Sequence, residues 1–413
     1  MRVGHGTALL RVPDGTPMGG YAARTSPSAG VLAPLQVDCV SIASGPDRFL
    51  LVVAELVGVN ADLAAEVRRR IGDEVWVCAT HTHSGPDVGS RPGGGTTPGT
   101  WLTAVADAAD KAARRAVANE AECEASHISG GLDGVGSRRA TDAGDRRVPV
   151  DVLRFGPTGR PTGVLAVVPV HPTVLPASST VVSGDLTAWI REELRAALGG
   201  SPWVVVATGA AGDISTRWTR TAQTVDEGRR LAELAAGQLS ALVATPGRSW
   251  SADDGIVAAR RTLTLPARQD DRDRLDGLRA EFAAQLAELA DDDPAGRAAV
   301  TALQGVEAAA ARTHDDTAAD AVGPDPVALE LGVVRLGGLT MQGIGGEPFL
   351  SLRDAAAPAV LLGYANGYAG YLPAAADFGT PAYEVLISPF RPDAADHVAG
   401  ALHELAHRSS HGG

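Results

Sequence analysis

Through the first half of the chain, short apolar runs typical of buried strands alternate with stretches of helical periodicity. The predicted strands cover residues 49–56, 75–78, 150–155, 164–170 and 203–207. The predicted helices cover residues 60–71, 101–119, 185–198 and 226–243. Strands that alternate with helices in this way are typical of layered architectures. We therefore predict an α/β (α+β) fold of layered sheets flanked by helices, formed as a single domain over residues 1–413.

The pattern becomes helical throughout between residues 266 and 313. Apolar residues recur at three-to-four spacing from Leu275 to Leu289, and an acidic stretch that ends at Pro294 marks the start of a second helix. The repeat is too short for a coiled coil, so we predict a helical hairpin packed on the body of the domain. Covering a pocket is the alternative role. We expect a connector over 314–326, strand character over 333–344 and a terminal helix over 394–407.

Composition excludes several classes of partner. The net charge of −13 disfavours nucleic acid and anionic membranes, which both require a basic face. Cys39, Cys78 and Cys123 are odd in number and widely spaced, which disfavours a disulfide framework and a cysteine zinc site. Neither a signal peptide nor a long apolar stretch is evident. We expect a cytoplasmic enzyme with a small-molecule substrate and no stable membrane association; homo-oligomerisation stays open.

Two histidines stand where a predicted strand ends. His81 and His83 follow the apolar run 75–78, and side chains two apart on a strand point to the same side. Two imidazoles that converge on one spot are a metal site, an acid–base pair or a hydrogen-bonded pair in the core. At the end of a hydrophobic strand, we favour metal binding or catalysis.

Other polar groups occupy the same structural context. His171 follows the run 164–170, the glycine-flanked Asp213 follows 203–207, and Glu347 follows 339–344. Because α/β folds assemble their sites where strands end, we predict one shared pocket. Two or three histidines and a carboxylate suit Zn²⁺ with one position left for water. Such a water loses its proton near neutral pH and becomes a nucleophile.

Four of the five tyrosines lie near the carboxyl end of the chain, among them Tyr364 and Tyr368. Their phenol rings can fill core space or line the pocket. For these two residues we favour packing.

An ordered set of motifs resembles the neutral/alkaline non-lysosomal ceramidase family, in its bacterial branch of ceramidase-like zinc hydrolases. The matching segments run along almost the whole chain. They are residues 17–21, 81–86, 137–139, 171–173, 212–215, 346–347 and 370–371, followed by Tyr383. The resemblance implies the catalytic-domain fold of that family and the hydrolysis of an amide bond.

The resemblance also implies roles for individual residues. The metal ligands for a single Zn²⁺ would be His81, His171, Glu347 and Tyr371. His83 would be the acid–base group beside the metal, and Arg138 would polarise or hold the substrate carbonyl. The remaining residues would be Ser215 as a nucleophile or a binder of a substrate hydroxyl, Tyr383 as a substrate-side hydroxyl, and Asp213 and Asp185 as groups that orient ligands or cap helices.

Several positions depart from the ceramidase pattern. Thr216-Arg217 replaces Pro-Asn after the Gly-Asp-x-Ser motif, Ser137 replaces an asparagine, and Pro373-Ala374 replaces Thr-Thr. The carboxy-terminal immunoglobulin-like domain of the family has no counterpart in this sequence. We therefore expect a small soluble N-acyl amine as substrate and not ceramide.

Three classes of function follow. The first is a zinc-dependent amidohydrolase that uses metal-activated water, with His83 as the proton carrier. The second is a biosynthetic zinc enzyme that performs cyclisation or acyl transfer through Ser215, or an esterase or lactonase that uses the same site. The third, a non-catalytic binding protein, is disfavoured because every matched ligand position is filled.

Overall fold

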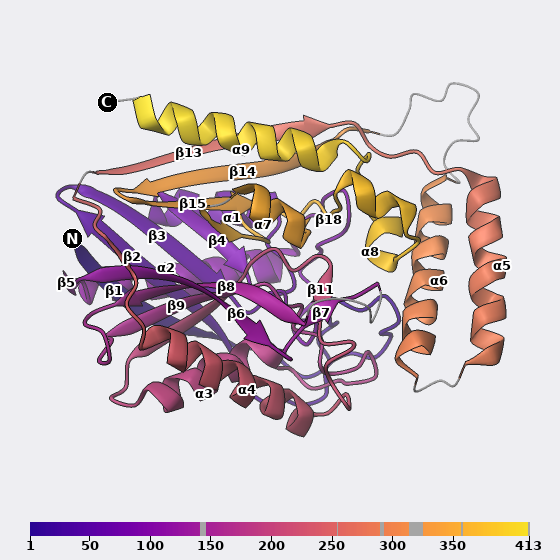
Figure 1. Cartoon of the computed structure of the whole chain (residues 1–413), viewed down its shortest axis with the longest axis horizontal. Coiled ribbons are helices and arrows are strands. Elements are labelled where there is room, and N and C mark those ends of the chain that lie inside the picture. Colours follow the sequence, from indigo (N-terminus) through magenta and orange to yellow (C-terminus); the bar gives the residue numbers. More distant parts are fainter. Residues whose placement is uncertain (141–145, 254, 290–292, 314–324, 357, 412–413) are drawn as a thin grey trace.

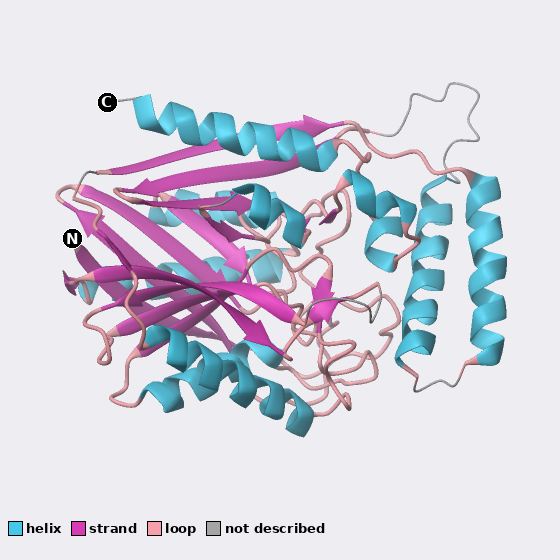
Figure 2. Cartoon of the chain, in the orientation of Figure 1, coloured by secondary structure: helices cyan, strands magenta, loops and turns pink. Residues whose placement is uncertain are grey.

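A computed structural model describes residues 1–140, 146–253, 255–289, 293–313, 325–356 and 358–411. Two five-stranded sheets and one four-stranded sheet, with two short ribbons, form the described part. Helices cover the outer faces of the three large sheets (Figure 1), and Figure 2 shows the same layering by element type. The predicted α/β architecture of layered sheets flanked by helices is confirmed.

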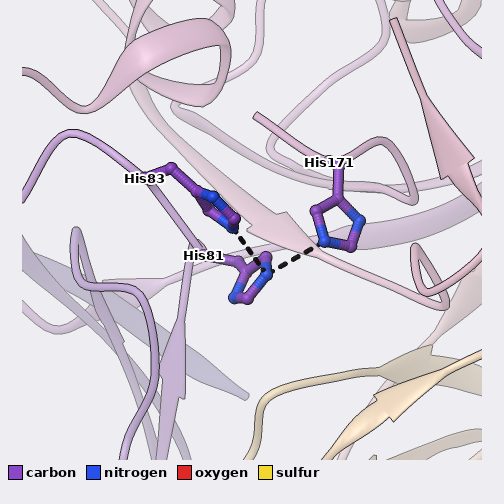
Figure 3. A group of neighbouring side chains, drawn as sticks. All are labelled: His81, His83 and His171. Atoms are coloured by element: carbon purple, nitrogen blue, oxygen red, sulfur yellow. Dashed lines mark hydrogen bonds between the residues drawn. The ribbon is translucent and has the colours of Figure 1, made fainter. Parts of the chain in front are cut away.

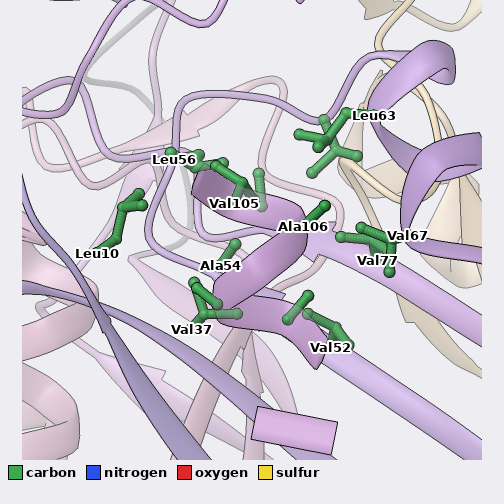
Figure 4. Packing of buried hydrophobic residues seen from close by; sticks show 14 of the residues in the cluster. Leu10, Val37, Val52, Ala54, Leu56, Leu63, Val67, Val77, Val105 and Ala106 are labelled. Atoms are coloured by element: carbon green, nitrogen blue, oxygen red, sulfur yellow. The ribbon is translucent and has the colours of Figure 1, made fainter. Parts of the chain in front are cut away.

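The first sheet has the strand order β4-β3-β2-β1-β5. Its strands are β1 (Arg2–Leu10), β2 (Leu35–Ser44), β3 (Asp47–Ala54), β4 (Val75–Ala79) and β5 (Ala121–Glu122). Helices α1 (Ala61–Ile71) and α2 (Gly99–Ala118) cover its outer face, where residues such as Val52, Leu63 and Val105 form a buried cluster (Figure 4). β3 and β4 run parallel, so the carboxyl ends of both strands lie at the same edge of the sheet.

The second sheet has the order β10-β9-β8-β6-β12. Its strands are β6 (Ala125–Asp133), β8 (Arg147–Phe155), β9 (Gly163–Val168), β10 (Trp203–Thr208) and β12 (Arg248–Trp250). Helices α3 (Asp185–Leu198) and α4 (Val225–Val243) pack on its outer face. β9 and β10 are parallel neighbours, so their carboxyl ends lie side by side.

The third sheet has the order β13-β14-β15-β17. Its strands are β13 (Ile256–Leu265), β14 (Val327–Leu336), β15 (Leu339–Ile344) and β17 (Val360–Leu362), and helices α7 (Leu350–Ala356) and α9 (Ala394–His411) pack against it. The strand-like run 333–344 thus forms parts of two antiparallel strands that reverse at Gly337 and Gly338. Gly337 has a φ of 56°, and a Cβ there would lie 1.9 Å from the Ser251 carbonyl oxygen. Only glycine allows this reversal.

The inner faces of the three sheets share one hydrophobic core. Trp76 from the first sheet, Phe155 from the second and Met341 from the third all lie in it. Full burial of side chains of this size contributes on the order of 2–3 kcal/mol each. This core fixes the sheets relative to one another, and with them the strand ends that carry the predicted site.

The predicted helical hairpin is present as α5 (Arg272–Glu288) and α6 (Pro294–Thr313). It stands at one end of the molecule beside α8 (Tyr383–Leu386) (Figure 1). Leu386 of α8 joins the hydrophobic cluster of the hairpin. Residues 314–324 of the predicted connector lie outside the described residues.

Short elements lie between the sheets and the hairpin (Figure 1). They are β7 (Ser137–Arg138), β11 (Ile214–Ser215), β16 (Glu347–Pro348), β18 (Tyr371–Leu372) and the 3₁₀ turn η2 (Ala375–Gly379). Among the described helices, none has the length and apolar character required to cross a bilayer.

Candidate functional site

The two histidines after β4 converge with a third from another sheet. His83 Nε2 lies 3.1 Å from His81 Nε2, which in turn lies 3.0 Å from His171 Nε2 (Figure 3). His81 has a φ of 65°, a left-handed backbone conformation that costs a non-glycine residue about 1–2 kcal/mol. The chain thus turns sharply where β4 ends and directs the imidazole inward. The predicted shared pocket brings these three histidines together.

Backbone carbonyls fix the rings of two of these histidines. His81 Nδ1 donates to the Val57 oxygen at 2.5 Å, and His171 Nδ1 donates to the Ala211 oxygen at 2.7 Å. With the proton held on Nδ1, each Nε2 presents a lone pair. Metal-binding histidines are commonly oriented by such a contact.

Glu347 and Tyr371 complete the cluster from two short strands. β16 and β18 are parallel, with Glu347 directly opposite Tyr371. Glu347 Oε2 lies 3.2 Å from His81 Nε2 and 3.1 Å from His171 Nε2. The Tyr371 hydroxyl lies 3.2 Å from His171 Nε2, and the planes of the two rings are nearly parallel, at 9° to each other. All four residues predicted as metal ligands therefore meet.

The donor set fits a metal ion. Two imidazole nitrogens and a carboxylate oxygen face one another at 3.0–3.2 Å, an arrangement that a shared metal ion would stabilise. Tetrahedral Zn²⁺ with bonds of about 2.0–2.1 Å would hold neighbouring ligand atoms about 3.3 Å apart. Among the described residues, His81, His83 and His171 also form a group whose ligand atoms lie within 4.8 Å of one another and could hold a metal ion.

His83 differs from the other two histidines. Its Nδ1 is buried and has no hydrogen-bond partner among the described residues, so no acceptor fixes its tautomer. The Tyr21 ring meets it edge-on at 4.7 Å, and Arg24 donates to the His83 carbonyl at 2.5 Å. Burial, followed by the charges of His81 and His171, lowers the pKa of His83 well below 6.5. A neutral imidazole serves metal ligation and proton transfer alike, so what sets His83 apart from His81 and His171 is the lack of an acceptor at Nδ1.

Tyr364 and Tyr368 do more than pack. The Tyr364 ring stacks on His81 at 4.2 Å, as expected for a packing residue. Its hydroxyl also donates to Glu347 Oε2 at 3.3 Å, and Tyr368 donates to Glu347 Oε1 at 2.5 Å. The preference for packing alone was therefore wrong for both residues, because their phenol hydroxyls hold the carboxylate that faces the histidines.

The two adjacent arginines have different surroundings. The Arg138 side chain is 47% exposed and pairs with Asp213 and Asp377 at 3.4 Å each. Arg139 is buried and donates to the Tyr371 hydroxyl at 3.0 Å. Sequence reasoning missed Arg139, although its place beside Arg138 in the matching segment was a usable signal. Burial raises the pKa of Tyr371 well above 10 while Arg139 acts to lower it, so a phenolate there requires further positive charge.

The loop after β10 contacts His171 through its backbone. Ser215 and His171 pair in an isolated backbone β-bridge, and the His171 N–H donates to the Ile214 oxygen at 3.0 Å. The buried Ser215 Oγ accepts from the Arg217 N–H at 3.3 Å. Asp213 accepts from the Leu350 N–H at 2.8 Å at the start of α7, as the helix-capping alternative predicted. Burial raises the pKa of Asp213 to about 6.

Asp185 and Tyr383 lie around this centre. Asp185 begins α3, and its carboxylate accepts from the Val174 and Leu175 N–H groups at 3.1 Å each, which ties down the segment after His171. The Tyr383 ring meets Tyr371 edge-on at 6.3 Å. Asp185 thus holds the backbone that follows His171, and Tyr383 contacts the cluster on the side of the hairpin.

Comparisons with known proteins agree at the level of the fold. No protein-family model and no curated protein matches the sequence. A solved structure of a ceramidase complexed with C2 matches with a TM-score of 0.74 and 17% identity, over 98% of this chain and 74% of the other. Neutral ceramidase from Pseudomonas aeruginosa matches with a TM-score of 0.72 and 18% identity, again over 98% and 74%. The chain therefore has the fold of the neutral ceramidases, as the motifs predicted.

Proposed function

We propose that this chain is a zinc-dependent amidohydrolase that cleaves the linear C–N bond of a small N-acyl amine. The observation that carries the proposal is the convergence of the His81 and His171 Nε2 atoms with Glu347 Oε2 at 3.0–3.2 Å. The similarity to solved ceramidase structures supports amide hydrolysis.

His81, His171, Glu347 and Tyr371 would hold the metal. A bound Zn²⁺ supplies a Lewis acid and lowers the pKa of water. Tyr364 and Tyr368 keep the Glu347 carboxylate in place through their hydroxyls, and Arg139 favours the phenolate form of Tyr371 by donating to its oxygen.

His83 would move the proton. Its low pKa keeps the imidazole neutral near pH 7, so it can accept a proton from the attacking water. The same nitrogen then returns that proton to the departing amine as the C–N bond breaks. Arg138, which lies half-exposed beside Asp213, would bind the substrate carbonyl oxygen, and Tyr383 would donate its hydroxyl on the side of the hairpin.

Direct attack by water fits the surroundings of Ser215 better than a covalent acyl route. Its buried oxygen accepts from the Arg217 N–H and, within the described residues, contacts no imidazole that could take its proton. Ser215 would instead bind a polar group of the substrate.

Metal analysis and turnover test the proposal together. We expect one Zn²⁺ per chain and hydrolysis of some members of a panel of short- and long-chain N-acyl amines. His171→Ala should lose both metal and activity. His83→Ala should keep the metal while kcat falls about 100-fold or more.

His397→Ala is the matched control, because His397 is exposed on α9. It should retain metal and turnover. Full turnover in His83→Ala would refute the acid–base role, and an acyl adduct on Ser215 in intact-protein mass spectrometry would favour the transfer alternative.

A further inference from the structure

The loop after Ser215 buries positive charge next to the cluster of metal ligands. Arg217 occupies the position where the ceramidase pattern has an asparagine, and its residue is only 8% exposed. Arg220 follows three residues later and is partly buried. Neither residue was assigned a role from the sequence, and the proposed hydrolysis does not use them.

Both guanidinium groups are bound by neutral oxygens. Arg217 donates to the Arg139 carbonyl at 3.0 Å and to Thr301 Oγ1 of α6 at 3.1 Å. Arg220 donates to the Thr173 carbonyl at 3.1 Å and to Thr216 Oγ1 at 2.9 Å. Within the described ranges, neither arginine has a carboxylate within 4.0 Å.

The carboxylates nearby do not balance this charge. Glu384 lies 3.8 Å from Arg139 Nε, and its charge also acts on Arg217, so one carboxylate serves two arginines. The charge of Asp185 attracts Arg220, but the Asp185 carboxylate already accepts from three backbone N–H groups. Burial and then repulsion by Arg139 lower the pKa of Arg217 to about 10, so the group is still charged at neutral pH. A buried cation without a counter-ion is destabilising, and a bound anion would remove that penalty.

Polar atoms without partners lie in the same region. Arg220 Nε is buried and has no hydrogen-bond partner among the described residues. The same holds for the Ser137 hydroxyl, whose residue is 5% exposed. Ser137 lies directly opposite Ser215 in the β7–β11 ribbon, and Ser215 itself forms a bridge with His171. Ser137 is thus connected to His171 through Ser215, Arg217 contacts the carbonyl of the arginine that donates to Tyr371, and Arg220 contacts the carbonyl of Thr173, two residues after His171.

We propose that the substrate carries a carboxylate that Arg217 binds, with Arg220 and the Ser137 hydroxyl assisting, so that the enzyme acts on N-acyl amino acids. This inference rests on the proposed amide hydrolysis for its reaction. The planar fork of arginine donors matches a carboxylate in two parallel hydrogen bonds. Departures from the ceramidase pattern at 137 and 217 thus have one explanation, since ceramide carries no such charge.

Two substrates of similar size, one charged and one neutral, test this proposal. For the wild type, kcat/KM for N-octanoylglycine should exceed that for N-octanoylethanolamine about 10–100-fold, the value of a charge-assisted hydrogen bond. Arg217→Gln should remove this preference by lowering activity on the glycine conjugate alone. Arg217→Lys should keep part of it. Arg248→Gln, at an exposed position of β12, is the matched control and should behave as wild type.

Calorimetric binding of N-octanoylglycine separates the two proposals. Arg217-dependent binding without turnover of either substrate would support the anion site and overturn amide hydrolysis. Turnover of both substrates at equal efficiency, with Arg217→Gln unchanged, would overturn the anion site and leave hydrolysis standing. Binding of N-octanoylglycine that survives Arg217→Gln would mean that its carboxylate binds the metal. That result would also overturn the anion site.

Discussion

The ring of Tyr364 lies against the ring of His81, with centroids 4.2 Å apart and planes 24° apart. Both residues have left-handed backbones, with φ of 55° and 65°. Tyr364 also accepts from the Ala79 N–H at 3.1 Å at the end of β4, and its N–H donates to the Gly346 oxygen at 2.9 Å. One tyrosine thus joins the strand that carries the histidines to the turn that carries Glu347, and the local backbone strain is the cost of that junction.

Removing the phenol hydroxyls should weaken metal binding. Tyr364→Phe and Tyr368→Phe each keep the ring but remove one of the two phenol donors to Glu347. Outer partners of this kind are worth about 10–100-fold in metal affinity, which chelator competition measures. Tyr383→Phe, which does not touch Glu347, should keep wild-type affinity. Unchanged metal affinity in both Tyr364→Phe and Tyr368→Phe would show that Glu347 is not a ligand.

Metal removal should destabilise the fold. Without a cation, His81 Nε2 and His171 Nε2 face each other and a carboxylate at 3.0–3.2 Å. At a metal concentration about 1,000 times Kd, binding adds about 4 kcal/mol to the free energy of unfolding. Urea unfolding with and without a chelator measures the difference. His81→Ala should show no chelator effect, and an equal effect in that variant would contradict the assignment.

Gly20 should control the position of His83. Its φ is +98°, and a Cβ there would lie 2.5 Å from His83 Cγ and 2.8 Å from His83 Cα. Gly20→Ala should therefore displace the imidazole, lowering kcat about 10–100-fold with metal content intact. Gly15→Ala is the control, since Gly15 also has a positive φ of +80° but nothing within 4 Å. Equal kcat in both variants would count against His83 as the proton carrier.

Glu227 should make stability depend on pH. Hydrogen bonding to Arg230 lowers the pKa of this carboxyl from 4.5 to about 2 in the folded chain. Its stabilising contribution is therefore complete above pH 4.5 and is lost as pH falls toward 2. Because Arg230 is 49% exposed, solvent screens the pair, and Glu227→Gln should cost only about 1 kcal/mol at pH 7.

Urea titrations of Glu227→Gln and wild type at pH 7 and pH 3 test this. The gap between them should shrink at the lower pH. Glu233→Gln, on the exposed side of α4, should show no gap at either pH. A gap that stays constant with pH would mean that the variant acts through packing and not through charge.

Sequence patterns located the site better than they described its interior. His81, His171 and Glu347 were found because each follows an apolar run, and parallel strands such as β9 and β10 place such ends together. Tyr371 came from the family resemblance alone. Arg139 was missed because two adjacent arginines look alike until the β7–β11 ribbon gives one the surface and the other the interior.

β1 was missed for a physical reason. Gly4 and Gly6 interrupt its apolar alternation, so no strand pattern is visible. The structure requires them, because a Cβ on Gly4 would lie 2.0 Å from the Ala116 oxygen of α2, and one on Gly6 would lie 2.2 Å from the Ala112 oxygen. Close approach of a helix thus removed the very side chains that would have identified the strand.

The cluster draws its members from distant parts of the chain. His171 comes 90 residues after His81, and Tyr371 another 200 residues later. During synthesis on the ribosome, the first two imidazoles are made long before the carboxylate and the phenol that complete their set. Tight uptake of the proposed metal would therefore come late in folding, and metal content would report how much of a preparation has reached the finished structure.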